Sequence, residues 1–196
     1  MSKRIFDIFF SFSGLIILSP LFIILAIIII SESRGGVFFR QKRVGKNSKI
    51  FRIFKFRSMY TGSDKKHRLT VGSGDRRITK SGKFIRKFKL DEIPQLINVL
   101  LGDMSIVGPR PEVPEYVKLY NDEQRQVLKV KPGITDYASI EYSDENELLA
   151  KADDAEKMYI NEIMPSKLKL NLKYIDEMSL KTDIGIIFST IRKVFS

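Results

Sequence analysis

The chain has 196 residues, enough for one globular domain of ordinary size. Cysteine is absent, which excludes disulfides, thiolate metal sites and cysteine nucleophiles. The formal net charge of +11 is unevenly distributed, because residues 34–90 contain 19 Lys and Arg against two acids and the rest of the chain is acidic overall. This basic block predicts an anionic partner: nucleic acid, lipid head groups or a phosphorylated substrate.

An uncharged apolar segment, residues 8–30, lies near the N-terminus. As a helix it would be about 35 Å long, enough for a hydrocarbon core of roughly 30 Å. A cleaved signal peptide fits poorly, because the run exceeds a typical h-region and no small-x-small cleavage site follows Ile30. Pro20 lacks an N–H and clashes with the preceding turn, while Ser19 can satisfy a freed backbone group. We therefore expect the helix to break at Ser19-Pro20.

Positive charge flanks the apolar segment on both sides, which by the positive-inside tendency places both ends in the cytoplasm. The flanking cations are Lys3, Arg4, Arg34, Arg40, Lys42, Arg43 and Lys46. A helix that bends at Ser19-Pro20 and returns to the same face satisfies both ends. We favour this re-entrant helix over a straight single-pass anchor, and expect a membrane part at 1–33 and a cytoplasmic domain at 34–196.

The remaining elements predict an α+β fold, with a small helix-rich domain and a short β-hairpin following the re-entrant helix. Residues 37–41 and 50–59 are rich in aromatic and β-branched residues and predict the hairpin, followed by a polar loop over 60–79. Apolar residues at helical spacing predict helices over 81–88 and from about Glu92 to Leu101, ending at Gly102.

The second half of the chain predicts further helices separated by turns. Pro109, Pro111 and Pro114 keep the backbone extended. We expect an acidic helix over about 114–130, a turn at "KPGIT" and an acidic helical stretch over 144–163.

A C-terminal helix is predicted over 180–195, with Ile184, Ile187, Phe188, Ile191 and Phe195 at helical spacing. Such a face most often packs in a core. Because an apolar membrane segment is present, lying in the membrane interface is the alternative.

Several kinds of site are excluded by missing motifs. No phosphate-binding G-x-x-x-x-G-K-[ST] loop is present, because Gly82-Lys83 is followed by Phe84. The single histidine, His67, lies in the polar loop without a ligand-spaced partner, so zinc chemistry and a histidine-based triad are not expected.

The adjacent acids Asp91 and Glu92 in "KLDEIPQ" have two readings. Asp91 can be a helix N-cap, with Glu92 in the first turn and Pro94 early in the helix. Alternatively, the basic block and a helix N-terminus keep the aspartate ionised. An ionised aspartate can attack phosphorus and form an acyl phosphate, or hold Mg²⁺ together with substrate phosphates.

Arg110 lies between two prolines, so its backbone is stiff, and its guanidinium matches two phosphate oxygens. A structural salt bridge is the alternative reading. Lys55 and Arg57 alternate onto the same face of their predicted strand and could add positive charge to one pocket, although a solvated strand face is the simpler reading.

The combination of several motifs resembles one family. The stretches "KRIFD", "FKFRSM", "KLDEIPQLINVLLGDMSIVGPRPEVPEY" and "KPGIT" are similar to the bacterial sugar transferases, the small monotopic polyprenyl-phosphate phosphoglycosyl transferases. The likeness covers roughly residues 3–135 and is looser beyond. It is specific only when the motifs are taken together.

The resemblance implies transfer of a sugar-1-phosphate from a UDP-sugar to undecaprenyl phosphate, with release of UMP, as the first membrane step of bacterial glycoconjugate or exopolysaccharide synthesis. Asp91 and Glu92 would be the catalytic pair and would hold Mg²⁺, and Asp91 would carry a covalent phosphosugar. Glu92 would assist either the metal or the acceptor phosphate. The residues expected to bind substrate phosphates are Arg110, Lys55, Arg57 and Arg86.

The resemblance also implies a bacterial inner-membrane protein with a re-entrant helix broken at Ser19-Pro20, a catalytic domain on the cytoplasmic face, and no additional transmembrane domain. Its partners would be the UDP-sugar, undecaprenyl phosphate and membrane lipid, without nucleic acid. A membrane-tethered nucleic-acid-binding protein and an anchored scaffold remain alternatives from charge and hydropathy. After "PGIT", Asp136-Tyr137-Ala138 replaces the Gly-Trp-Ala of many members, which leaves sugar specificity open.

Overall fold

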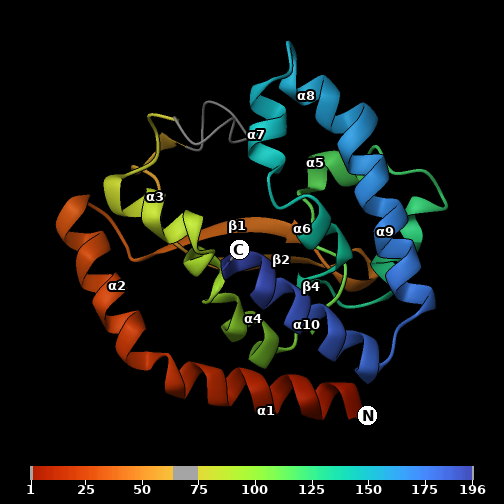
Figure 1. Ribbon diagram of the computed structural model, residues 1–196, viewed down its shortest axis with the longest axis horizontal. Coiled ribbons are helices and arrows are strands. Elements are labelled where there is room, and N and C mark those ends of the chain that lie inside the picture. The colour runs from red at the N-terminus through yellow and green to blue at the C-terminus, as the bar shows by residue number, and fades with distance from the viewer. Residues whose placement is uncertain (1, 64–74, 196) are drawn as a thin grey trace.

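A computed structural model describes residues 2–63 and 75–195 of the chain (Figure 1). Its longer helices are α1 (Ser2–Ile17), α2 (Ser19–Glu32), α3 (Lys80–Lys87), α4 (Gln95–Leu101), α9 (Met164–Asp176) and α10 (Leu180–Phe195). Its shorter helices are α5 (Pro114–Val117), α6 (Tyr137–Glu141), α7 (Glu145–Ala150) and α8 (Ala155–Met158). The strands are β1 (Phe38–Val44), β2 (Ile50–Phe56), β3 (Ser105–Val107) and β4 (Gly133–Thr135).

Helices α1 and α2 form a bent arm along one side of the molecule (Figure 1). The bend between them is 61°, and the Ser19 hydroxyl donates to the Ile16 carbonyl at 2.7 Å. Pro20 lies in the first turn of α2, where its missing N–H costs no hydrogen bond. The predicted break at Ser19-Pro20 is therefore confirmed. Among the described residues no single helix is long and apolar enough to cross a bilayer, whereas α1 and α2 together meet that requirement.

The polar side chains of α1 attach the arm to the rest of the protein. Arg4 donates to the carbonyls of Val99 and Leu100 at the end of α4, at 2.6 and 3.0 Å. Asp7 is buried and accepts from the Ser105 hydroxyl and the Ile106 N–H, both at 3.0 Å. These bonds satisfy helix-end and strand groups that would otherwise lack partners, so α1 packs as part of the domain.

The predicted hairpin is confirmed: β1 and β2 pair antiparallel, from Phe38 opposite Phe56 to Val44 opposite Ile50. One face packs Phe51 and Ile53 against Val99 and Met104. The amide of Asn98 fastens α4 to β2, accepting from Phe54 N at 2.8 Å and donating to Arg52 O at 2.9 Å.

A second sheet was not predicted. We expected a turn at "KPGIT", but the last three residues of this stretch form strand β4, which pairs parallel with β3. The backbones there approach closely: a Cβ on Gly133 would lie 2.1 Å from Gly108 N. Only glycine fits, and the pairing depends on a partner more than 20 residues away in the chain, which a local pattern does not reveal.

Several predicted helices differ from those observed. The helix expected from Glu92 begins at Gln95, although it ends before Gly102 as predicted, with Gly102 left-handed at φ 88°. The stretch 114–130 contains only α5 and a 3₁₀ helix, Gln124–Lys129, instead of one helix. The stretch 144–163 is divided into α7, α8 and a π-helical turn, Tyr159–Ile163. Helix α9 was not predicted, although α3 was.

Helix α10 is confirmed as a helix, and it packs on the core through Ile186 and Ile187, but part of its predicted apolar face is exposed. Ile186 and Asp183 are buried, whereas Ile184, Phe188 and Ile191 are 44–69% exposed. Met59, just before the predicted loop over 60–79, forms a β-bridge with Ile78 near the end of that loop, while His67 lies outside the described residues.

Candidate active site

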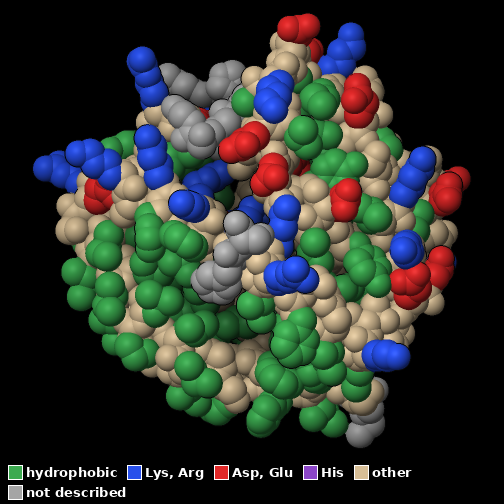
Figure 2. Space-filling model, viewed as in Figure 1, with side chains coloured by type: hydrophobic (Ala, Val, Ile, Leu, Met, Phe, Trp, Pro, Cys, Tyr) green, Lys and Arg blue, Asp and Glu red, His purple; other side chains and the backbone are tan. Residues whose placement is uncertain are grey.

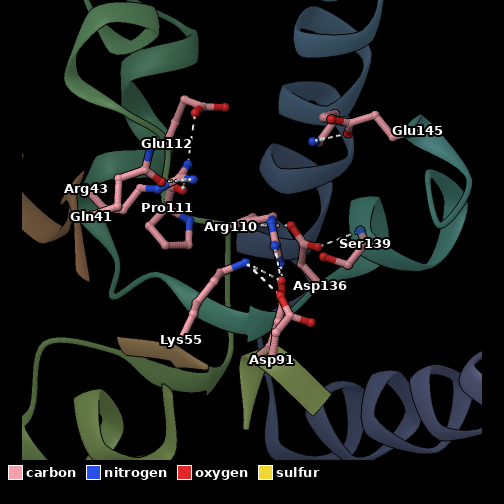
Figure 3. A network of polar contacts seen from close by, with 12 residues as sticks. Gln41, Arg43, Lys55, Asp91, Arg110, Pro111, Glu112, Asp136, Ser139 and Glu145 are labelled. Carbon is pink, nitrogen blue, oxygen red and sulfur yellow. Dashed lines mark hydrogen bonds and ion pairs between the residues drawn. The ribbon is translucent and has the colours of Figure 1, made fainter. Parts of the chain in front are cut away.

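Two basic side chains, Lys55 and Arg110, meet the adjacent acids in one polar cluster (Figure 3). The Lys55 Nζ lies 2.7 Å from Glu92 Oε1 and 3.7 Å from Asp91 Oδ2. The Arg110 guanidinium grips Glu92 with both terminal nitrogens, Nη1 bonding Oε2 at 3.0 Å and Nη2 bonding Oε1. The cluster therefore joins β2, the segment before α4 and the loop after β3.

The acids lie in a tight 3₁₀ turn, Leu90–Glu92, and not at the start of α4. Lys89, which precedes this turn, adopts the left-handed conformation with φ 54°, an uncommon state for a residue with a side chain. Pro94 occupies the N-cap position of α4, without a side-chain cap. The reading of Asp91 as an N-cap is therefore wrong, because the turn at Lys89 ends α3 and directs both acids to the interior.

The pKa values of the two adjacent acids are shifted in opposite directions. Burial raises the pKa of Asp91, and the charge of Glu92 raises it further, against the opposing charges of Lys55, Arg86 and Lys89. The cations act in the predicted direction, since each of them lowers the pKa of Asp91, but the net shift is upward because burial outweighs them. Asp91 is 7% exposed, and its loss of hydration outweighs the attraction of the cations.

Glu92 is held ionised by its partners. Burial alone would raise its pKa, but the charges and hydrogen bonds of Arg110 and Lys55 hold that pKa well below the usual range. Burial lowers the pKa of Lys55, with the two carboxylates opposing that change. The charge of Glu92 raises the pKa of Arg110. Glu92 thus fixes the two cations beside Asp91.

The backbone of Arg110 is held by a residue whose role the sequence analysis missed. Asp136, fully buried, accepts from Arg110 N at 3.1 Å and from Ser139 N at 2.7 Å, the latter as the N-cap of α6 (Figure 3). An aspartate three residues before Ser139 in "DYAS" is a capping signal that the sequence contained. Its contact with Arg110 across 26 residues had no local signal.

A second hydrogen-bond network holds Pro111 and Glu112, the two residues that follow Arg110. Arg43 donates to Pro111 O at 3.0 Å and to Glu112 Oε1 at 3.1 Å, and Tyr159 donates to the other oxygen of Glu112. The chain around Arg110 is therefore rigid before any ligand binds. Rigid placement of a guanidinium is what bidentate phosphate binding requires.

Two of the predicted phosphate-binding residues lie apart from this network. Arg57 is turned to the end of α2, where it donates to Ser33 O at 2.7 Å and to Arg34 O at 3.0 Å. It does not share a pocket with Lys55, because β2 ends at Phe56 and alternation no longer applies. Arg86, half-buried on α3, is close enough for its charge to lower the pKa of Asp91.

The cluster is compatible with Mg²⁺ only as a site shared with a ligand. Within residues 2–63 and 75–195 no group of three or more His, Cys, Asp or Glu side chains could hold a metal. Mg²⁺ is commonly bound by one or two carboxylates together with substrate phosphates and water. Both oxygens of Glu92 accept hydrogen bonds from Lys55 and Arg110, whereas Asp91 meets Lys55 at the longer distance of 3.7 Å, so Asp91 is the carboxylate less committed to the protein's own cations.

Comparison with known proteins identifies the family. The bacterial sugar transferase family matches the chain over residues 1–196. The chain belongs to this family. The resemblance drawn from the combined motifs is therefore confirmed. Lys55 of the buried cluster lies in "FKFRSM", Asp91 and Glu92 in "LDEIPQL", and Arg110 in "VGPRP".

Curated relatives match almost the whole chain. It is 38% identical, over 99% of its length, to UDP-N-acetylgalactosamine-undecaprenyl-phosphate N-acetylgalactosaminephosphotransferase of Aeromonas hydrophila. It is 38% identical, over 98% of its length, to UDP-glucose:undecaprenyl-phosphate glucose-1-phosphate transferase of Escherichia coli. The chain spans only 44% and 40% of these two relatives, but 86% of the uncharacterized sugar transferase EpsL of Bacillus subtilis, to which it is 36% identical.

Proposed function

We propose that the chain transfers a sugar-1-phosphate from a UDP-sugar to undecaprenyl phosphate and releases UMP. The observation that carries this proposal is the buried cluster in which Glu92 fixes Lys55 and Arg110 beside Asp91. The names of the relatives, which specify undecaprenyl phosphate and different sugars, support the reaction class. The sugar itself stays open.

Asp91 is the proposed nucleophile. Its carboxylate oxygen attacks the β-phosphorus of the UDP-sugar, forming an O–P bond while the bond from that phosphorus to the bridging oxygen breaks and UMP leaves. An oxygen of the acceptor phosphate then attacks the same phosphorus, and the bond to Asp91 breaks. The carboxylate is restored and the product is the polyprenyl-diphosphate-linked sugar.

The charges around Asp91 suit this exchange. A buried carboxylate with a raised pKa is more basic than an ordinary aspartate, and Lys55 at 3.7 Å favours its ionised form. Arg110 and Arg86 provide positive charge for the diphosphate, which would otherwise repel the nucleophile. Because Glu92 is committed to Lys55 and Arg110, we assign it to positioning these cations instead of to metal binding.

Mg²⁺ is the proposed cofactor, held by Asp91 together with the phosphates of the donor. When bound, it would neutralise charge on the diphosphate. The protein would provide one carboxylate for it, that of Asp91, so metal affinity should depend on the nucleotide. Metal binding measured with and without UDP-sugar tests this directly.

The decisive experiment is the Asp91→Asn variant, assayed for UMP release from UDP-sugars with undecaprenyl phosphate and Mg²⁺. We expect release to be abolished. Since burial opposes ionisation of Asp91, the variant should unfold at the same or a higher temperature than the wild-type protein at neutral pH. Wild-type turnover in a folded Asp91→Asn protein would exclude Asp91 as the nucleophile.

We propose that α1 and α2 anchor the protein in the bacterial inner membrane as a re-entrant pair, with the domain on the cytoplasmic face. Hydrophobic side chains gather over this arm in Figure 2, in the lower left of the view. Phe9 and Ile17 on α1 and Ile27 on α2 are more than 60% exposed. Exposed apolar surface of this extent indicates a membrane or protein partner, and α10 offers further exposed apolar residues.

The topology is tested by placing single cysteines at Ser2 and Ser33 in this cysteine-free chain. We expect an impermeant thiol reagent to label both positions only from the cytoplasmic side. Labelling of position 2 from the outer side would show a straight span and overturn the re-entrant arrangement.

A further inference from the structure

The end of α2 is fastened to the strand that carries Lys55. Arg57, two residues beyond Lys55, is 7% exposed, and its guanidinium reaches the carbonyls at the end of this helix. It donates to Ile29 O at 3.3 Å, to Ser33 O at 2.7 Å and to Arg34 O at 3.0 Å. A cation at a helix C-terminus also interacts favourably with the helix dipole, so Arg57 both hydrogen-bonds carbonyls at this helix end and stabilises the negative end of the dipole.

The chain leaving α2 is shaped around this guanidinium. Gly35 has φ +129°, and a Cβ at that position would lie 2.1 Å from Arg57 Nη1. The Thr61 hydroxyl also contacts this turn and donates to Arg34 O at 2.7 Å. A side chain at position 35 would therefore displace Arg57, and the turn has no freedom to move independently of β2.

The last residue of α2 is fastened to the helix that leads to the acids. The Glu32 carboxylate accepts from the N–H groups of Lys80 and Ser81, at 2.5 and 2.9 Å, and from the Ser81 hydroxyl. These are the first residues of α3, whose other end carries Arg86 and continues to Asp91. A carboxylate at a helix N-terminus is stabilised by its free N–H groups and its dipole.

We propose that Arg57 and Glu32 form an exit clamp, which fixes the catalytic cluster at a set position relative to the membrane arm. Arg57 holds the segment with Lys55, and Glu32 holds the segment with Arg86 and Asp91. Both are positioning residues, since neither touches the reacting groups. The clamp acts in the half-reaction in which the lipid-linked acceptor attacks the phosphosugar. This inference rests on the proposed function.

The two substrates reach the cluster differently. A UDP-sugar diffuses in water and can meet Asp91 whatever the orientation of the arm. The acceptor phosphate is attached to a chain in the bilayer, so its height above the membrane is fixed. It meets the phosphosugar on Asp91 only if the arm holds the cluster at that height. Misplacement of reacting groups by about 1 Å can reduce a rate about 100-fold.

The clamp is first tested without substrate, by hydrogen exchange of the full chain in lipid nanodiscs. Arg57→Lys keeps the charge, but its single ammonium cannot reach the carbonyls that the planar guanidinium spans. We expect exchange to rise about tenfold at residues 29–35 and also at 80–92. Arg52→Lys, at an exposed position on the same strand, is the matched control and should change neither segment. A rise confined to 29–35 would overturn the clamp, because the two segments would then be independent.

The second test separates the two half-reactions, with UDP-glucose and UDP-N-acetylgalactosamine as probe donors. In Arg57→Lys and Glu32→Gln, we expect single-turnover UMP release without acceptor to change less than about twofold. The kcat/KM for undecaprenyl phosphate in complete turnover should fall about 10- to 100-fold. Equal losses in both half-reactions would indicate a general structural role and refute the clamp. Absence of UMP release by the wild-type protein with these donors and with a wider panel of UDP-sugars would instead count against the proposed function, and the exchange experiment would still decide the clamp.

Discussion

Replacing Glu92 with glutamine removes the negative charge that Lys55 and Arg110 share. Breaking a buried ion pair by neutralising one partner costs about 3–5 kcal/mol, because the other charge is left uncompensated. Here the side chain of Arg110 is 32% exposed, and Asp91 can turn to Lys55 from 3.7 Å. We therefore expect a loss of about 2 kcal/mol, which for a chain of this length lowers the Tm by about 4–8 °C.

The loss should depend on pH in a defined direction. The pKa of Glu92 is well below its usual value in the folded state, so its contribution is present above the ordinary glutamate pKa of about 4.3. This contribution to stability is lost as the pH falls through the folded-state pKa of Glu92. The Tm difference between wild type and Glu92→Gln should thus be complete at pH 7 and shrink only in acid below about pH 4.

Thermal unfolding of the full chain in detergent, measured from neutral to acid pH, checks this expectation. Glu162→Gln, at an exposed position on the same protein, is the control and should change stability by less than about 0.5 kcal/mol. If Glu92→Gln lost the same stability at acid pH as at pH 7, the effect would come from packing and not from the charge. An unchanged Tm at pH 7 would refute the ion-pair reasoning altogether.

Two further variants probe the arginine. Arg110→Lys keeps the charge but loses the two-nitrogen grip on Glu92, so we expect kcat/KM for UMP release to fall about 10- to 100-fold, with a folded protein verified by circular dichroism. Asp136→Asn replaces one of two accepting oxygens with a donor, opposite the N–H of Arg110 or Ser139. It should cost about 1–3 kcal/mol in denaturant unfolding, and a loss below about 0.5 kcal/mol would show that Asp136 does not fix this loop.

The fold was predictable wherever the interaction was local. The hairpin follows from strand-forming residues on both sides of a short turn, and Gly102 ends α4 because it can be left-handed. The parallel pairing of β3 with β4 joins segments that are far apart in the chain. The acidic stretches 114–130 and 144–163 have helical composition but are interrupted where their apolar residues must reach one common core.

For the site, the sequence indicated the residue types but not their pairing. Lys55 and Arg57 are two positions apart and were expected in one pocket, yet the first contacts Glu92 and the second the end of α2. The strand ends between them, so alternation could not decide the matter. Asp136 offered a capping signal, but its contact with Arg110 depends on the second sheet bringing the two loops together.

The pKa values of Asp91 and Glu92 are shifted in opposite directions. The +17 charge of residues 34–90 therefore did not by itself predict the direction of the pKa shift of Asp91. Most cations of that block are exposed, where water screens them, and a screened charge acts weakly over distance. Lys55 and Arg110 act strongly because they are hydrogen-bonded to Glu92, and that commitment leaves Asp91 with the cost of burial. The division gives one acid that holds the cations and one that is left for the proposed reaction, and it depends on contacts across 37 and 18 residues.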